Sequence, residues 1–308
     1  MSLLYATLWA GLWAPVQATG VAPHDLPCPL DGTAVRVFEK LSGNTHGGWD
    51  SDMARYASQG QWRRYAISTC QQDFLSLYGE DWEELSGTLV PDSVREILAP
   101  YISTDPETLE IWDRYLIAAD VYRSLGRDAR FLGQLYLEAS WTARDVAVGE
   151  YGGLEGPVMA RQLLEAGAIE LEKELPPTTR KILLHNLARV AHRGGFNRER
   201  NAYLDAFEAV GDFSTPETRV LRRFQQIVEE VEPALQDRAI TEFERWLEEH
   251  PEPSPEAMRL NYVLADLHRR RGHPEQAARG YARVLASEHS TQEIKDLSAF
   301  LKDEVQSP

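Results

Sequence analysis

The chain has 308 residues, of which 43% are hydrophobic and 26% charged, and its formal net charge is -16. This composition is typical of a globular protein with room for more than one domain, and it excludes a disordered chain. Because an acidic excess repels a phosphate backbone, nucleic acid is not an expected partner.

The N-terminal segment is apolar. Leu3 to Val16 contains no charged residue, and it is too short to cross a hydrocarbon core of about 30 Å as a helix. It is followed by Gln17 and Ala18, which complete a small-x-small cleavage pattern. We predict a signal peptide over 1–18 and an exported, periplasmic or extracellular protein. The alternative is a buried or interfacial helix in a cytoplasmic protein. Later in the chain, no run approaches the roughly 20 apolar residues of a membrane span.

The two cysteines each begin a motif that is typical of metal sites. Cys28-Pro29-Leu30-Asp31-Gly32 has the pattern of a zinc knuckle, in which a thiolate and a second ligand three positions later form half of a tetrahedral site. In the second motif, Cys70 would be joined by Asp73. Zinc accepts carboxylate oxygen, although structural sites use mainly cysteine and histidine. One interpretation is therefore a zinc site of Cys28, Asp31, Cys70 and Asp73.

A glycine-rich acidic loop lies between the cysteines. His46, Asp50 and Asp52 are spaced so that they could gather a cation or act as an acid and base, as in a metal-dependent hydrolase. The simpler interpretation is a turn whose carboxylates cap backbone N–H groups. The aromatic residues of this region are predicted to form the core of a small domain: Trp49, Tyr56, Trp62, Tyr65 and Phe74.

Helical patterns replace strand patterns after Trp82, with a boundary expected between residues 85 and 105. Three segments combine an N-cap oxygen, a proline at the first helical position and an early glutamate, and they predict helix starts: Asp105-Pro106-Glu107, Thr215-Pro216-Glu217 and Ser254-Pro255-Glu256. Ser290-Thr291-Gln292-Glu293 is a capping box for a last helix that ends near Val305.

Parts of this region match the tetratricopeptide pattern of paired helices. The best copies are Leu264-Ala265 with Gly272, Ala277 and Tyr281, and Ala239 with Phe243, Trp246 and Pro251. The turn glycines Gly126, Gly195 and Gly272 predict further helix pairs over Gly156 to Leu175 and Pro216 to His250. We predict a mainly α fold: a tetratricopeptide-like helical-hairpin solenoid over 91–308, preceded by a small zinc-ribbon-like domain over 19–90. A non-repeating helical bundle is the alternative.

The chain resembles an uncharacterised bacterial family with a CPxC…CPxCG metal-knuckle domain followed by tetratricopeptide-like helices. The matching segments are Cys28 to Gly32, Asp50-Ser51-Asp52 with Tyr56, Cys70 to Asp73, and Glu138 to Asp145. Here each knuckle has aspartate in place of its second cysteine. In an oxidising compartment, a site reduced in this way would leave two thiols close enough to form a disulfide. A disulfide, a metal site and free buried thiols remain the alternatives for Cys28 and Cys70.

The resemblance also implies a concave groove lined by the first helix of each pair, a surface suited to peptides. The groove positions are Asp120 and Arg123, then His185, Arg189 and His192, then Arg259, Tyr262, Asp266 and Arg269. The last seven of these are the predicted partner-binding residues. Because the middle group is locally basic, an acidic or C-terminal peptide segment is the expected partner.

Catalytic signatures are scarce. The sequence contains no GxxxxGK[ST] loop, no HExxH and no GxSxG elbow. We therefore predict a non-catalytic, exported interaction or scaffold protein that binds a protein or peptide and needs no cofactor. The alternative is a metal-dependent enzyme, or a metal or redox sensor, centred on Cys28 to Asp73 and containing zinc.

Overall fold

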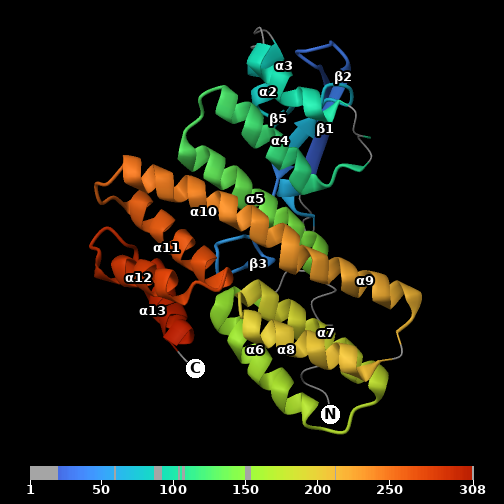
Figure 1. Ribbon diagram of the computed structural model, residues 1–308, viewed down its shortest axis with the longest axis vertical. Coiled ribbons are helices and arrows are strands. Elements are labelled where there is room, and N and C mark those ends of the chain that lie inside the picture. The colour runs from blue at the N-terminus through green and yellow to red at the C-terminus, as the bar shows by residue number, and fades with distance from the viewer. Residues whose placement is uncertain are drawn as a thin grey trace.

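A computed structural model of the protein describes residues 20–58, 60–86, 92–102, 105, 108–149, 154–211 and 213–306 (Figure 1). The predicted signal peptide over 1–18 lies outside the described residues, as does the predicted boundary between 90 and 91. The division into two domains therefore stays a prediction.

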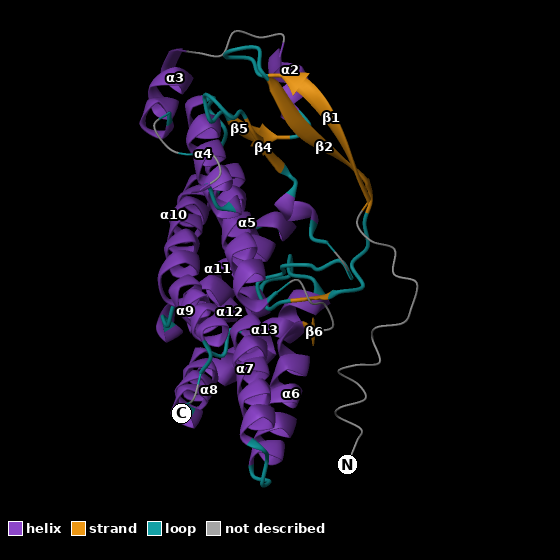
Figure 2. Ribbon diagram, turned by 90° about the vertical axis from the view of Figure 1, so that its right-hand side faces the viewer, coloured by secondary structure: helices purple, strands orange, loops and turns teal. Residues whose placement is uncertain are grey.

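The N-terminal part contains two short antiparallel hairpins. Strand β1 (Gly20–Pro27) pairs with β2 (Ala34–Ser42), and β4 (Ile67–Thr69) pairs with β5 (Ser76–Tyr78). Over the first four residues of β2, exposed and buried positions alternate, as expected where one face of a strand covers a core, and the rest of the strand is half-buried or exposed. Figure 2 shows the β1–β2 hairpin to one side of the helices. The two-residue strand β3 (Gly48–Trp49) pairs in parallel with β6 (Leu154–Glu155), a strand that the sequence does not predict.

The rest of the described chain is mainly helical, which confirms the predicted class. The helices are α2 (Asp81–Ser86), α3 (Asp92–Leu98), α4 (Ile111–Ser124), α5 (Ala129–Val148), α6 (Gly156–Leu171), α7 (Pro177–Gly194), α8 (Asn197–Val210), α9 (Thr215–Gln226), α10 (Glu232–Glu249), α11 (Pro255–Arg270), α12 (Pro274–Ala286) and α13 (Gln292–Gln306). Short 3-10 turns occur at η2 (Trp62–Arg64) and η3 (Ala99–Tyr101). Helices that follow one another pack together at α4–α5, α6–α7, α7–α8, α11–α12 and α12–α13, while α5 packs against the distant α10.

Helix capping follows the sequence closely at two of the predicted starts. Ser254 caps α11, and its side chain accepts a hydrogen bond from the backbone N–H of Ala257. At α9 the cap is Ser214, one residue before the predicted Thr215. The predicted start Asp105-Pro106-Glu107 falls partly outside the described residues. The N–H of Thr108 donates to the carbonyl of Asp105 (2.9 Å), and α4 begins at Ile111 with Glu110 as its cap.

The segment Pro216 to His250 is not the predicted helix pair. Helix α9 continues through a π segment, η5 (Ile227–Val231), directly into α10, and Figure 1 shows α9 and α10 following one line. Pro233 at the beginning of α10 has no N–H to bond to the preceding turn, which is a common cause of irregular helix geometry. The π segment thus joins the helices without a turn and directs Glu232 into the interior, where it is buried.

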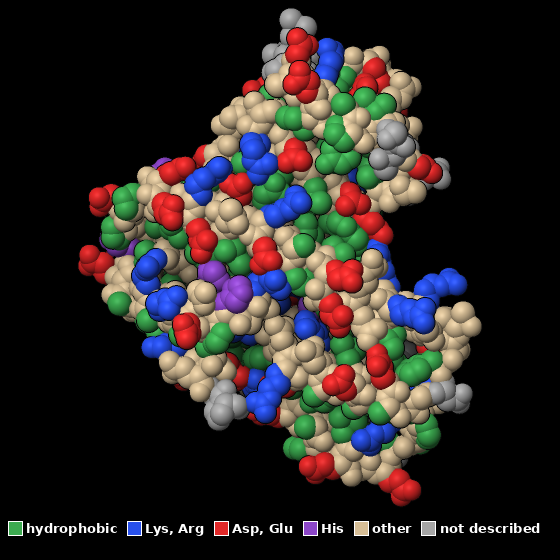
Figure 3. Space-filling model, in the orientation of Figure 1, with side chains coloured by type: hydrophobic (Ala, Val, Ile, Leu, Met, Phe, Trp, Pro, Cys, Tyr) green, Lys and Arg blue, Asp and Glu red, His purple; other side chains and the backbone are tan. Residues whose placement is uncertain are grey.

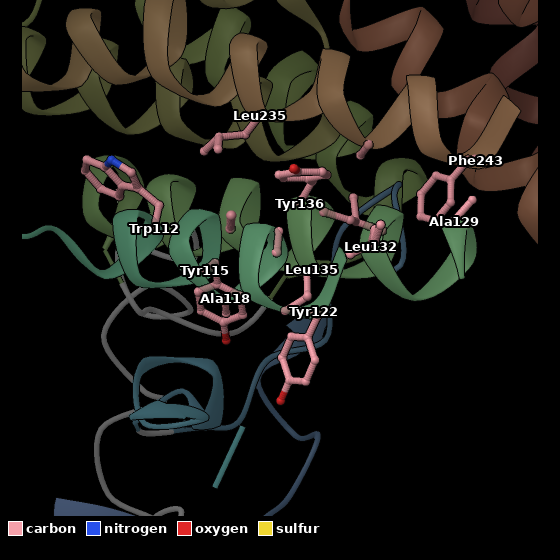
Figure 4. Close-up of a cluster of buried hydrophobic side chains, with 14 of the residues drawn as sticks. Trp112, Tyr115, Ala118, Tyr122, Ala129, Leu132, Leu135, Tyr136, Leu235 and Phe243 are labelled. Carbon is pink, nitrogen blue, oxygen red and sulfur yellow. The ribbon is translucent and has the colours of Figure 1, made fainter. Parts of the chain in front are cut away.

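The core is centred where α5 lies between α4 and α10 (Figure 4). Gly133 of α5 permits close contact, because a Cβ atom there would lie 2.4 Å from the ring of Phe243 in α10. The same hydrophobic cluster includes residues of both hairpins, among them Val35 and Leu77. Of the aromatic residues predicted in a small core, Tyr56 and Phe74 are buried, while Trp49, Trp62 and Tyr65 are half-buried.

Candidate functional site

The two cysteines form a disulfide, with their Cα atoms 6.2 Å apart. Each cysteine begins the turn of one hairpin, and the two turns have the same backbone pattern. The N–H of Gly32 donates to the carbonyl of Cys28 (2.8 Å), and the N–H of Phe74 donates to the carbonyl of Cys70 (3.1 Å). Gly32 and Phe74 both have positive φ, 75° and 60° respectively. The disulfide is confirmed, and free buried thiols are excluded in this state.

Asp31 and Asp73 occupy equivalent places in the two turns. Ligand atoms of Cys28, Asp31 and Asp73 lie within 4.8 Å of one another. Asp31 accepts hydrogen bonds from the N–H (2.8 Å) and the hydroxyl (2.6 Å) of Thr33. Burial raises the pKa of Asp73, and the neighbouring Asp31 raises it further. Three of the four metal ligands predicted from the sequence therefore lie close together, but both sulfur atoms are bonded to each other in the disulfide.

In the acidic loop between the cysteines, Asp50, Ser51 and Asp52 are wholly buried. Asp50 accepts hydrogen bonds from Arg144 of α5 (3.0 Å), from Arg193 of α7 (2.7 Å) and from the hydroxyl of Tyr56 (2.7 Å). Asp52 accepts two from Arg144, at 3.0 and 2.6 Å. Two carboxylates from one loop thus hold arginines from two helices.

Ser51, between these aspartates, contacts α11. Its hydroxyl donates to Asp266 (2.8 Å) and accepts from Arg269 (2.9 Å) and Arg270 (2.6 Å). Its carbonyl accepts from the hydroxyl of Tyr262 (2.6 Å). The loop Asp50–Asp52 therefore contacts α5, α7 and α11 together.

Glu232 of α10 extends this network. It accepts hydrogen bonds from Arg144 (2.6 Å) and from Nε2 of His192 (2.7 Å). Arg200 donates to Nδ1 of His192 (3.2 Å), so the neutral imidazole carries its proton on Nε2. Burial lowers the pKa of His192, although Glu232 opposes the shift. Burial would raise the pKa of Glu232, but Arg144 and His192 outweigh it and lower the pKa to about 2.

The carboxylates of this network are charged and paired within the interior. Burial alone would raise the pKa of Asp52, but Arg144 and Arg270 hold it well below its usual range, so the carboxylate stays charged. Asp50, Asp52 and Asp266 have no exposed surface. His46, in contrast, is exposed.

An open cleft lies beside this loop. Its volume is about 760 Å³, and its walls come from residues 49–55 together with α5, α10, α11 and α13. The apolar lining consists mainly of Trp49, Met53, Trp141, Leu260, Val263 and Ile294. The indole N–H of Trp141 donates to Asp52 at 3.0 Å, so the buried network fixes one wall of the cleft.

Charged side chains of both signs line the cleft beside its apolar surface. They are Arg55, Arg130 and Arg259 together with Asp52, Glu256 and Glu293. Arg130 pairs with Glu256. Arg55 and Arg259 are exposed, and within the described part of the chain no ion pair involves either side chain. Figure 3 shows acidic and basic side chains interspersed over one face of the molecule.

The predicted partner-binding residues do not share one surface. Arg259 lines the cleft. His192, Tyr262, Asp266 and Arg269 belong to the buried network described above.

Two further predicted residues lie elsewhere on α7. His185 is half-buried, with its ring 5.7 Å from that of Phe207 and 6.0 Å from that of Phe224. Arg189 is half-buried, and its charge contributes to lowering the pKa of His185. The groove prediction assumed exposed first helices, whereas the acidic loop covers this part of α11.

Sequence reasoning missed Arg55, Arg130 and Trp141 in the cleft and Arg144 in the network. A signal for Arg144 exists, because this arginine lies in a helical stretch, Ala139 to Val148, whose other residues are mostly small or apolar apart from Asp145. A charged residue on the buried face of a helix needs a partner, and the partners are the loop aspartates.

Comparison of the chain with protein-family models, curated proteins and solved structures finds no match. None of the helices in the described ranges is both long enough and apolar enough to cross a membrane. The resemblance to the knuckle-containing family stays a prediction.

Proposed function

We propose that the protein is a non-catalytic interaction module whose cleft binds an acidic segment of a protein partner. The observation that carries the proposal is the combination of aromatic and aliphatic walls with exposed Arg55 and Arg259. Buried aromatic surface supplies most of the energy in such contacts, and arginine pairs with carboxylates through two parallel hydrogen bonds. Arg259 is the predicted partner-binding residue that this proposal retains.

Charge favours a peptide with carboxylates next to an apolar side chain. The protein as a whole is acidic, with a net charge of -16, so an acidic segment is repelled elsewhere and attracted at the cleft. The tetratricopeptide-like solenoid belongs to the same proposal. Helix α12 supports it, since the small residue Gly280 lies against Ala265 of α11 at the close contact that such a helix pair requires.

Selection from a random dodecapeptide display library tests the binding. We expect selected peptides to carry Asp or Glu beside an apolar residue. Fluorescence anisotropy with a labelled selected peptide should show binding weakened about tenfold or more by Arg259→Glu and by Arg55→Glu. The matched control is Arg95→Glu, an exposed arginine of α3, which should bind as the wild type does. Peptides without acidic residues, or equal binding by all variants, would contradict the proposal.

We propose further that the protein is exported. The Cys28–Cys70 disulfide supports this, because such bonds persist in oxidising compartments. Counting thiols in protein taken directly from cells tests it. We expect thiols that react only after reduction, whereas two freely reactive thiols would contradict both the disulfide in the cell and export.

A second candidate is a metal or redox sensor at the hairpin turns. The specific observation is that Cys28, Asp31 and Asp73 already lie within 4.8 Å of one another, so reduction would add thiolates to carboxylates that are in place. Elemental analysis of reduced protein purified with zinc tests this candidate. One bound zinc that is lost in Asp73→Asn supports it, and zinc-free reduced protein excludes it.

A further inference from the structure

Two histidine rings face each other at the turn between α11 and α12. His268 lies in the last turn of α11, and His273 precedes the first residue of α12. Their Nδ1 atoms are 3.5 Å apart, and their ring centroids are 5.7 Å apart. The cleft and the disulfide turns involve neither residue.

The backbone of the turn fixes this separation. The N–H of His273 donates to the carbonyl of His268 (2.8 Å), and the N–H of Gly272 donates to the carbonyl of Arg269 (3.0 Å). Gly272 has φ of 74°, a left-handed conformation that glycine adopts without strain. The two rings are therefore brought together by a closed helix end rather than by a loose loop.

The distance between the nitrogens matches a tetrahedral metal ion. Zinc lies about 2.0–2.1 Å from each histidine nitrogen, which places two nitrogens at tetrahedral angles about 3.3–3.4 Å apart. Adjacent ligands in a square plane would lie about 2.9 Å apart, as Cu²⁺ prefers. The observed 3.5 Å is closer to the tetrahedral value and favours Zn²⁺.

A carboxylate on α10 orients one of the rings. Oε1 of Glu244 lies 3.4 Å from Nε2 of His268, on the side of the ring opposite to His273. A proton held on Nε2 by Glu244 leaves the lone pair of Nδ1 directed toward His273. This carboxylate–histidine arrangement is the one that usually supports a metal-binding histidine.

The charged groups around the pair are of both signs, and Arg279 and Arg283 line the cavity that adjoins His268. Glu244 faces it from α10, and Arg279 faces it from α12. Arg279 lies 3.9 Å from Glu275, and Arg271 pairs with Asp237. A cavity of about 180 Å³ adjoins His268, with room for water ligands, and His273 is exposed.

We propose that His268 and His273 are two ligands of a Zn²⁺ site that water completes, with Glu244 orienting His268. For both Nδ1 atoms to bind the metal, the proton of the neutral His273 ring must reside on Nε2. The exposed ring of His273 can move its proton there by exchange with solvent. The proposal stands independently of the peptide-binding cleft.

Calorimetric titration of untagged, chelator-treated protein with Zn²⁺ at pH 7.5, with the disulfide intact, tests the site. We expect one equivalent bound by the wild type. His273→Ala should weaken binding at least about tenfold, and Glu244→Gln about tenfold, the lower end of the range for such supporting carboxylates. His289→Ala, which removes an exposed histidine elsewhere, should change nothing. Zinc binding that survives His273→Ala, or that is lost in Asp31→Asn/Asp73→Asn instead, would overturn the proposal.

Long-range ¹H–¹⁵N spectra of the wild-type imidazoles provide a test that needs no variant. Saturating Zn²⁺ should shift Nδ1 of both rings while Nε2 keeps its proton. Unchanged resonances of His268 and His273 at saturating Zn²⁺ would also overturn it.

Discussion

Arg144 is the side chain at which three buried carboxylates meet. It donates to Asp50, Asp52 and Glu232, and neither it nor its aspartate partners have any exposed surface. A guanidinium has five donors in a rigid fork, so one residue can bind carboxylates from a loop and from α10 at the same time.

Replacing Arg144 with methionine should destabilise the protein by about 3–5 kcal/mol, because the carboxylates would stay buried without their cation. Urea unfolding followed by circular dichroism measures the change. Arg36→Met is the control, since Arg36 forms an exposed pair with Asp25 and should change the free energy of unfolding by less than about 1 kcal/mol. A free energy for Arg144→Met within 1 kcal/mol of the wild type would contradict a structural role for the network.

His185 should make stability depend on pH. Burial, aided by the charge of Arg189, lowers its pKa to about 4, whereas the unfolded chain has the ordinary value of about 6.5. Between these values the unfolded state binds more protons, so stability should fall by roughly 3 kcal/mol as the pH decreases from 6.5 to 4. Urea unfolding at pH 7 and pH 4.5 should show a smaller loss for His185→Gln than for the wild type.

The variant is compared with the wild type because other groups titrate in the same range. The pKa values of Asp73 and Glu138 are raised by burial, so their folded forms bind protons first and gain stability as the pH falls. The contribution of Glu232 to the free energy of unfolding is lost only as the pH falls from about 4.5 toward 2. An equal loss of stability in His185→Gln and wild type would show that His185 does not contribute.

The contact between α5 and α10 depends on the glycine in α5. A Cβ at Gly133 would lie 2.4 Å from two ring atoms of Phe243, which is too close unless the helices separate. Gly133→Ala should therefore destabilise the protein by about 1–2 kcal/mol, even though alanine favours helix.

A double-mutant cycle provides the control for this contact. Because Phe243→Leu reduces the ring to a smaller side chain, Gly133→Ala should cost less in that background than in the wild type. Thermal unfolding of the four proteins measures the coupling. Equal costs in both backgrounds would contradict a direct contact between Gly133 and Phe243.

The elements that could be predicted from sequence are those with local causes. Ser254 caps α11 where predicted, because the cap and its partner are three residues apart. The turn glycines Gly126, Gly195 and Gly272 all have positive φ at helix ends. The π segment before Pro233 could not be predicted in this way, since the proline alone equally suggested a new helix.

The candidate sites could be predicted less well than the helix caps and turns, because the residues that contact one another in these sites are far apart in the sequence. Asp50 and Asp52 were expected to cap their own turn, and Asp52 does accept from the N–H of Ala54 (3.4 Å). Their main partners, however, include Arg144, 92 and 94 residues away. The disulfide between Cys28 and Cys70 was one of three alternatives, and it came from the resemblance of the two cysteine motifs to paired metal knuckles. No motif in the sequence indicated the cleft.

Across the whole molecule, the hairpins and the acidic loop are held in place by different interactions. The disulfide joins the two hairpin turns to each other, 42 residues apart. The loop between them is held by α5, α7 and α11 through buried charges. Losing the disulfide should therefore loosen the hairpins without releasing the loop.

Cys28→Ser/Cys70→Ser should lower the free energy of unfolding by roughly 4 kcal/mol, the chain-entropy value for a loop of this size. Hydrogen exchange followed by mass spectrometry should show faster exchange in Gly20–Ser42 and Ile67–Tyr78. Exchange in α5 and α11 should change little by comparison. A uniform increase over the hairpins and all helices would contradict the separate attachment of hairpins and loop.

The acidic loop also constrains the order in which the chain can complete its fold. Ser51 contacts Asp266, Arg269 and Arg270, up to 219 residues later in the sequence. During synthesis from the N-terminus, the aspartates emerge long before α11 exists, and contacts of such separation form slowly. The loop must therefore remain hydrated until the C-terminal helices arrive. A ribosome-bound chain that ends before α11 should expose Asp50 to Asp52 as a protease-sensitive segment, and the complete chain should protect it.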